Sequence, residues 1–295
     1  MTDQAIEDTQ GRVASWRLLV GNPVTVVCAV VLAVVLVIAV TAQWLAPYGI
    51  NDVDVPNALQ SPSGAHWFGT DELGRDVLSR VLVAIQASMR VAVVSVAFAV
   101  VVGVTVGVVA GYRGGWVDTV FMRVVDVMFA FPVLLLALAI VAILGPGVTT
   151  TMLAIGVVYT PILARVSRAS TLSVRTAPYV AVSRTMGTGH VYVLVRHVLP
   201  NIAGPLIVQT SLSLAFAILS EAALSFLGLG IQPPQPSLGR MIFDSQGFVT
   251  LAWWMAVFPG AAIFVIVLAF NLFGDGLRDV LDPKQRTMLE ARRQR

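Results

Sequence analysis

The feature that most constrains this sequence is an apolar stretch, residues 127–164, that contains no charged side chain. A helix needs about 20 apolar residues to cross the hydrocarbon core of a bilayer, so this stretch is too long for one crossing. The tripeptide Gly145-Pro146-Gly147 lies near its middle. It predicts a turn that divides the stretch into two membrane spans.

Four shorter apolar stretches raise the predicted number of spans to six. They cover residues 24–42, residues 91–110, a segment from about 202 to 226, and residues 253–273. An acidic leader precedes the first stretch, which argues against a cleaved signal peptide. The chain is 57% hydrophobic and only 12% charged, whereas an ordinary soluble domain is about 25% charged. The sequence therefore predicts an all-α integral membrane protein with six transmembrane helices in residues 24–274.

Charge is distributed unevenly between the two long loops. The segment after the fourth predicted span, residues 165–197, carries five arginines and no acidic residue, whereas the loop after the first span carries five acidic residues and two arginines. Cytoplasmic loops of membrane proteins have an excess of lysine and arginine. The distribution predicts that the N-terminal segment 1–23, the basic loop and the tail 275–295 all lie in the cytoplasm.

Both long loops contain helical patterns. In the outer loop, residues 43–87, Asp71 is predicted to cap a helix that lies along the membrane surface or against the bundle. The apolar stripe of this helix is Leu73, Val77, Val81 and Ile85. In the cytoplasmic loop, residues 167–201, the segment 178–187 predicts a short helix closed by glycine. A capped helix in a cytoplasmic loop of this length is typical of a docking surface for a partner.

The residue types needed for several kinds of chemistry are missing. A phosphate-binding loop requires a lysine after glycine and before Ser or Thr, but the single lysine, Lys284, is followed by Gln285. The three histidines, His66, His190 and His197, lack the spacing of metal ligands. The sequence contains no basic surface interleaved with aromatic residues, so it does not predict nucleic-acid binding. We therefore expect no catalytic residue, metal site or cofactor in this chain.

Two acidic residues lie within the apolar stretches. Asp126 is near the inner end of the third span, and we favour an interfacial pair with Arg123, one helical turn away, over a role in lining a transport pathway. Glu221 is in the outer part of the fifth span, where a carboxylate must face the bundle interior or a water-filled cavity. Two roles remain open for Glu221 at this point: a group that lines a transport pathway, or a structural acid hydrogen-bonded between helices.

Four separated motifs together resemble one transporter family. Residues 179–187, followed by the segment 197–201, resemble the EAA loop of ABC-importer permeases. The runs 68–76, 221–230 and 271–279 narrow the resemblance to the C-type permease subunit of the dipeptide, oligopeptide and nickel import family. One departure concerns the EAA triplet, which falls on Ala181-Val182-Ser183 and so lacks the acidic residue of the family. Gly187 and the segment 197–200 are retained.

The resemblance implies the type I ABC-importer fold and a permease that is not itself an enzyme. Such a permease pairs with a homologous B-type subunit in the bacterial cytoplasmic membrane and moves peptides inward by alternating access. An extracytoplasmic binding protein delivers the peptide, and two ATP-binding subunits carry ATP and Mg²⁺. The residues that the resemblance places against the ATP-binding subunit are Tyr179, Val180, Ala181, Val182, Ser183, Arg184, Met186, Gly187, His197 and Pro200.

Three alternatives to peptide import remain. Import of nickel or another small solute is less favoured, because the spans contain almost no histidine or acidic lining. A secondary transporter driven by an ion gradient would need ionisable relays near the middle of the membrane and internal repeats. A membrane scaffold without transport would leave the loop motifs unexplained.

Overall fold

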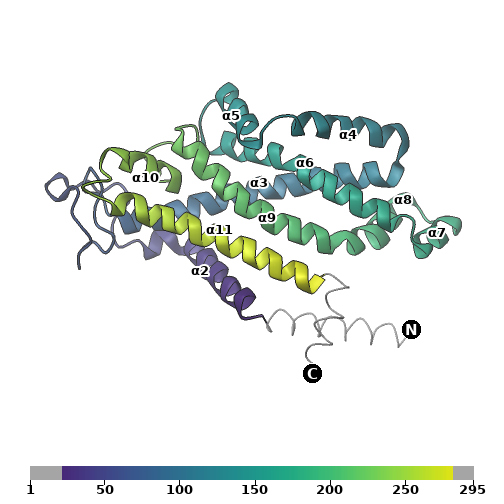
Figure 1. Ribbon diagram of the computed structural model, residues 1–295, viewed down its shortest axis with the longest axis horizontal. Helices are drawn as coiled ribbons and strands as arrows, with labels where there is room; N and C mark the ends of the chain where they lie inside the picture. Colours follow the sequence, from purple (N-terminus) through teal and green to yellow (C-terminus); the bar gives the residue numbers. More distant parts are fainter. Residues whose placement is uncertain (1–21, 282–295) are drawn as a thin grey trace.

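A computed structural model describes residues 22–281 of the chain, and within them the fold is an elongated bundle of helices (Figure 1). Five long helices form the bundle: α2 (Pro23–Leu45), α3 (Val77–Arg113), α6 (Val148–Val174), α9 (Leu199–Phe226) and α11 (Trp254–Leu281). The N-terminal segment before residue 22 and the part of the tail beyond residue 281, which includes Lys284, lie outside the described residues.

Each long helix of the described chain is apolar enough to cross a membrane, with α9 counted together with the helical segment that precedes it from His190. Two shorter helices, α4 (Gly115–Phe129) and α5 (Val133–Leu144), meet at an angle of 90° and pass the same test only as a pair. The third predicted span, residues 127–144, is therefore not one straight helix. Pro132 explains the break, because its ring disfavours helical backbone at the preceding residue.

The turn predicted at Gly145-Pro146-Gly147 is confirmed. Helix α5 ends at Leu144 and α6 begins at Val148. Gly145 and Gly147 both have positive φ angles, of +89° and +159°. Glycine reaches such angles at little steric cost, so this tripeptide ends one helix and redirects the chain into the next.

The prediction that Asp71 caps a separate surface helix is wrong. Asp76 caps α3 instead, because its carboxylate accepts hydrogen bonds from the Ser79 amide at 2.8 Å and the Ser79 hydroxyl at 2.7 Å. Helix α3 then continues for 37 residues, or about 55 Å at 1.5 Å per residue. The apolar residues Val77, Val81 and Ile85 are thus the buried start of a long membrane helix. Leu73 precedes that helix.

Helices α3 and α6 pack very closely along the bundle axis. A Cβ atom placed on Gly103 would lie 2.7 Å from the Thr160 carbonyl oxygen, and one on Gly107 would overlap the backbone of Ala164. Small residues at membrane-helix contacts let the two backbones approach in this way. The Ser167 hydroxyl, fully buried at this contact, donates to the Leu163 carbonyl at 2.7 Å.

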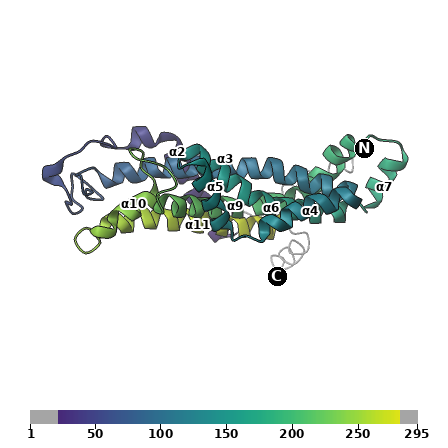
Figure 2. The same ribbon diagram turned by 90° about the horizontal axis from the view of Figure 1, so that it is seen from above.

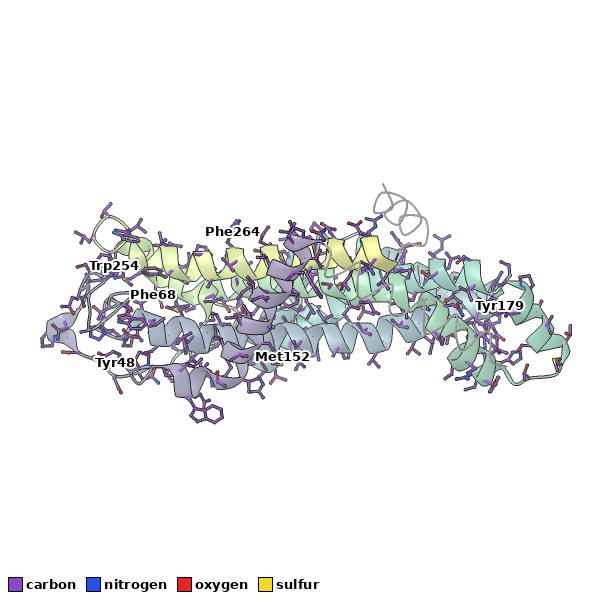
Figure 3. The ribbon with its side chains drawn as sticks, turned by 90° about the horizontal axis from the view of Figure 1, so that it is seen from below. Tyr48, Phe68, Met152, Tyr179, Trp254 and Phe264 are labelled. Atoms are coloured by element: carbon purple, nitrogen blue, oxygen red, sulfur yellow. The ribbon has the colours of Figure 1, made fainter. Side chains whose placement is uncertain are left out.

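The two long loops lie at opposite ends of the bundle. At one end, which we call the loop end, residues 46–76 pack beside α10 (Leu238–Asp244) (Figures 1 and 2). At the other, which we call the coupling end after the docking surface that the sequence predicts there, lie α7 (Pro178–Thr185) and α8 (His190–Val193). Figure 3 shows the separation by side chains, with Tyr48, Phe68 and Trp254 at the loop end and Tyr179 at the coupling end.

Candidate functional site

The short helix predicted in the loop of residues 167–201 is present as α7 (Pro178–Thr185). It ends in a turn at Gly187, whose φ is +76°. The Met186 amide donates to the Val182 carbonyl at 3.0 Å, and the Thr188 amide donates to the Ser183 carbonyl at 3.3 Å. This is the pattern of a helix closed by a left-handed residue, and it confirms that Gly187 adopts positive φ.

Among the described side chains of α7, one is buried and several are exposed. Val180 is fully buried in a small apolar cluster with Val193 and Val198 of the following helical segment and with Val108 of α3. The exposed residues of α7 and its turn include the apolar side chains Tyr179, Ala181, Val182 and Met186 and the polar side chain of Thr185. Nothing is described for the side chain of Arg184. The helix is therefore anchored to the bundle on one side and presents an apolar surface on the other.

His197 joins α7 to the start of the next long helix. Its Nε2 atom is hydrogen-bonded to the Ser183 hydroxyl at 3.1 Å. Its ring also lies 5.8 Å from the ring of Tyr192 and 6.2 Å from that of Tyr179, between ring centres. The structure thus brings together Tyr179, Ser183 and His197, which the sequence motifs named as separate positions. Pro200, also named there, is exposed near the start of α9.

A second contact attaches the coupling end to α3, and sequence reasoning missed it. The hydroxyl of Tyr112, a buried residue of α3, lies 3.2 Å from Nδ1 of His190. Nearby, the Arg175 guanidinium donates to the Gly111 carbonyl at 2.8 Å. Nothing in the sequence distinguishes Tyr112 from the aromatic residues that commonly end a membrane span.

The expected pairing of Asp126 with Arg123 is wrong. Asp126 of α4 accepts a hydrogen bond from Arg165 of α6 at 2.8 Å, and both side chains are about half exposed. The Arg165 guanidinium also lies 4.1 Å from the ring centre of Phe129. The reason is tertiary: α4 packs against α6, so an arginine on α6 reaches Asp126.

Glu221 of α9 is fully buried between helices. The Ser88 hydroxyl of α3 donates to one carboxylate oxygen at 2.6 Å, and the Ser225 hydroxyl donates to the other at 2.7 Å. The Ser225 oxygen also accepts from the Ile231 amide at 3.2 Å, which draws the segment after α9 into the same network. The carboxylate therefore links two membrane helices and a loop.

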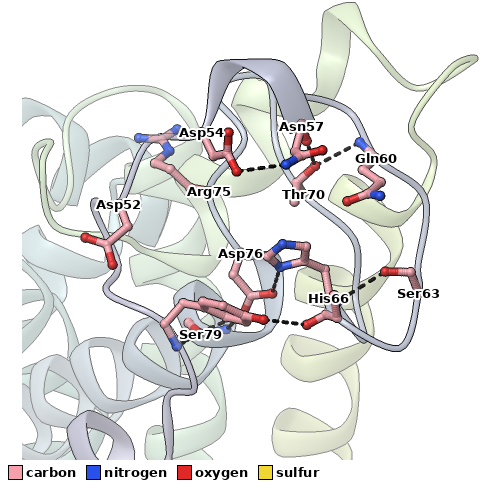
Figure 4. A network of polar contacts seen from close by, with 12 residues as sticks. Asp52, Asp54, Asn57, Gln60, Ser63, His66, Thr70, Arg75, Asp76 and Ser79 are labelled. Carbon is pink, nitrogen blue, oxygen red and sulfur yellow. Dashed lines mark hydrogen bonds and ion pairs between the residues drawn. The ribbon is translucent and has the colours of Figure 1, made fainter.

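The motif at residues 68–76 forms a folded cap on the loop end (Figure 4). His66 contacts the α3-capping carboxylate of Asp76 at 2.9 Å. The Thr70 hydroxyl donates to the Asn57 carbonyl at 2.6 Å, and the Trp254 indole donates to the Thr70 carbonyl at 3.0 Å. Phe68 stacks on Phe258 of α11, with ring centres 3.9 Å apart.

A buried group of charges borders this cap. Asp71 accepts from the Arg75 guanidinium at 2.6 Å and lies 3.4 Å from that of Arg80, while Glu72 pairs with Arg75 at 2.9 Å. Burial raises the pKa of the Glu72 carboxyl, and the adjacent Asp71 adds to the shift. The motif residues thus have a clear structural task, which is to fold residues 46–76 onto the ends of α3 and α11.

Comparison with known proteins identifies the family. Residues 103–287 match the binding-protein-dependent transport system inner membrane component, and residues 9–62 match the N-terminal TM domain of oligopeptide transport permease C. The chain belongs to this permease family. The resemblance drawn from the four motifs is thereby confirmed, and the protein is a multi-pass permease of the bacterial inner membrane.

Two curated relatives cover nearly the whole permease. The chain is 43% identical to the probable D,D-dipeptide transport system permease protein DdpC of Escherichia coli K12, over 90% of each chain. It is 40% identical to the dipeptide transport system permease protein DppC of Alkalihalophilus pseudofirmus, over 95% of this chain and 94% of the relative.

A solved structure supports the fold. A chain of the MetNI methionine ABC transporter in an inward-facing conformation aligns with a TM-score of 0.58 at 18% identity, over 69% of this permease and 96% of that chain. The type I ABC-importer architecture expected from the motifs is thus supported at the level of fold.

Proposed function

We propose that this permease is one half of a heterodimer that imports di- or oligopeptides into the cytoplasm. The dipeptide-transport names of its relatives, which align with almost its full length, support peptide as the cargo class. The other half is a homologous B-type permease, and an extracytoplasmic binding protein delivers the peptide. ATP and Mg²⁺ belong to two ATP-binding subunits, so this chain carries out no covalent chemistry.

The proposed topology has six spans with both termini in the cytoplasm, the bent α4–α5 pair forming the third span. Helix contacts support an even number of crossings. Gly276 near the end of α11 packs against Thr25 near the start of α2. Gly204 near the start of α9 lies beside Leu281. The described ends of the chain therefore lie together and toward the coupling end, whose arginines favour the cytoplasmic side.

The observation that carries the coupling role is the two-sided character of α7. Its exposed apolar residues Tyr179, Val182 and Met186 suit a groove on an ATP-binding subunit, while the buried Val180 fixes the helix to the bundle. When nucleotide binding moves the ATP-binding subunits, α7 transmits the displacement through Val180 and through the Tyr112–His190 contact. The membrane helices then tilt, and access to the pathway changes from one side to the other.

Glu221 is assigned a structural role in this proposal. Its two serine donors and its complete burial support a carboxylate that holds α3, α9 and the following loop together. A group that binds passing cargo would need to reach an open cavity.

Reconstitution tests the proposed function directly. The permease, its B-type partner, the ATP-binding subunits and the binding protein are placed in proteoliposomes, and uptake of radiolabelled alanyl-alanine is measured with and without ATP. We expect ATP-dependent accumulation that requires every subunit. Accumulation that follows an ion gradient without ATP, or ATP-driven uptake of Ni²⁺ with no uptake of peptide, would replace the proposal with one of its alternatives.

A further inference from the structure

A cavity of about 530 Å³ opens at the loop end of the bundle. Its walls come from α2, α3, the start of α6 and the segment after α9. The residues that line it include Leu36, Gln43, Gln86, Arg90, Val148 and Gln235. The volume is within the usual range of small-molecule sites, about 300–1,000 Å³.

Among the residues that the structure describes, Arg90 is the one charged side chain that lines this cavity. Its side chain is exposed, and within residues 22–281 it forms no ion pair. The following residues 91–112 of α3 carry no charge. They extend for about 33 Å along the helix, which is close to the thickness of the hydrocarbon core. Arg90 therefore lies at the mouth of the membrane-embedded part of the bundle.

The other polar groups of the cavity are amides. Gln43 and Gln235 are exposed side chains on two different walls. Gln86 is held in place, because its amide nitrogen donates to the Ala39 carbonyl of α2 at 2.7 Å. Amide side chains both donate and accept hydrogen bonds, which matches the backbone of a peptide. A lipid phosphate would use the guanidinium but would have no need of three surrounding amides.

We propose that Arg90 binds the C-terminal carboxylate of a peptide entering the pathway, with Gln43 and Gln235 beside the peptide backbone. A guanidinium holds a carboxylate through two parallel charge-assisted hydrogen bonds, which fixes orientation as well as position. This inference rests on the proposed function, because it requires peptide as the cargo. It adds a specific demand: the cargo must have a free carboxyl terminus.

The test compares two cargoes in the reconstituted transporter: alanyl-alanine and its C-terminal amide, alanyl-alaninamide. Each uptake rate for the variant Arg90→Gln is divided by the unsubstituted rate for the same cargo at saturating binding protein, so that the preference of the binding protein cancels. We expect uptake of alanyl-alanine to fall about tenfold or more, with little change for the amide. The matched control Arg113→Gln removes the same charge from the exposed far end of α3. It should leave the ratio between the two cargoes unchanged.

Two results would overturn the assignment. Equal slowing of both cargoes would mean that the guanidinium holds a lipid phosphate or an acidic residue of the second permease. Unchanged rates for both cargoes in Arg90→Gln, with normal peptide uptake by the unsubstituted complex, would remove Arg90 from recognition while leaving peptide import intact. Absence of any peptide uptake by the unsubstituted complex would instead refute the proposed function itself.

Thiol labelling provides a readout that depends on neither uptake nor the binding protein. A cysteine at Leu36 on the cavity wall, in a Cys28→Ser background, is reacted with a maleimide in the purified complex. Millimolar alanyl-alanine should slow the reaction, whereas alanyl-alaninamide should not. Adding Arg90→Gln should abolish the protection, and Arg90→Lys, which keeps the charge, should preserve part of it. Equal protection by the acid and the amide would contradict the proposal.

Discussion

Gly187 permits a controlled test of how α7 is held. Its φ is +76°, and a Cβ atom placed on it would meet no other atom within 4 Å. Gly189 has equally open surroundings but a φ of −62°. Alanine at either position therefore adds the same methyl group to the same loop without a clash. Only the backbone angle at the substituted residue differs.

The expected cost follows from that angle. A residue with a Cβ atom loses about 1–2 kcal/mol in the left-handed region, which lowers the population of the native turn about 5- to 30-fold relative to other conformations. Gly187→Ala and Gly187→Leu should therefore loosen the end of α7. Gly189→Ala should be close to neutral, because its φ is available to any residue. Gly187→Asn should retain much of the native behaviour, because asparagine adopts left-handed backbone more readily than alanine does.

The assay measures retention of the ATP-binding subunit on affinity purification and peptide moved per ATP hydrolysed. Gly187→Ala and Gly187→Leu should lose the subunit or hydrolyse ATP without moving peptide, and both should be more defective than Gly187→Asn. Gly189→Ala should resemble the unsubstituted complex. Normal coupling in Gly187→Leu would refute the reasoning. Equal defects in the two alanine variants would show that any side chain in this loop is harmful, irrespective of φ.

Two further predictions concern topology and the buried acid. Single cysteines at Asp52 and His190, in a Cys28→Ser background, should react with impermeant reagents added to opposite faces of the membrane, and labelling of both from outside would reverse the proposed orientation. Glu221→Gln should keep uptake and melting temperature near normal, whereas Glu221→Ala strands the Ser88 hydroxyl and should destabilise the bundle by about 1–3 kcal/mol. A stable Gln variant with impaired uptake would instead place Glu221 in the pathway.

Hydrophobic length and turn chemistry were enough to predict most of the bundle. The uncharged stretches correspond to the long helices, because a membrane helix must cover the hydrocarbon with apolar residues. Two features were not predictable in this way. The 90° bend between α4 and α5 depends on how Pro132 redirects a helix within the packed bundle. The unbroken start of α3 depends on a choice between Asp71 and Asp76 as the cap, and the pairing of Asp71 with Arg75 and Arg80 decides it.

Side-chain partners were harder to predict than helices, because they depend on packing between distant segments. The Asp126–Arg165 pair joins residues 39 positions apart, and the Tyr112–His190 contact joins residues 78 apart. A sequence pattern that considers only residues one helical turn apart selects Arg123 as the partner of Asp126. The same pattern cannot find His190 as the partner of Tyr112. Arg90 illustrates the same limit, because an arginine at the end of an apolar stretch is also what an ordinary interfacial residue looks like.

Helix α3 connects the features on which the proposed cycle depends. Asp76 fixes its start to the cap at the loop end, Ser88 joins it to α9, and Tyr112 contacts the coupling segment at its far end. Helices α6, α9 and α11 each contain an internal proline, but α3 has none. Because its backbone hydrogen bonding is continuous, we expect a displacement at the coupling end to move the Arg90 end with it instead of being absorbed at a kink. A proline introduced into the middle of α3 should therefore separate ATP hydrolysis from peptide movement.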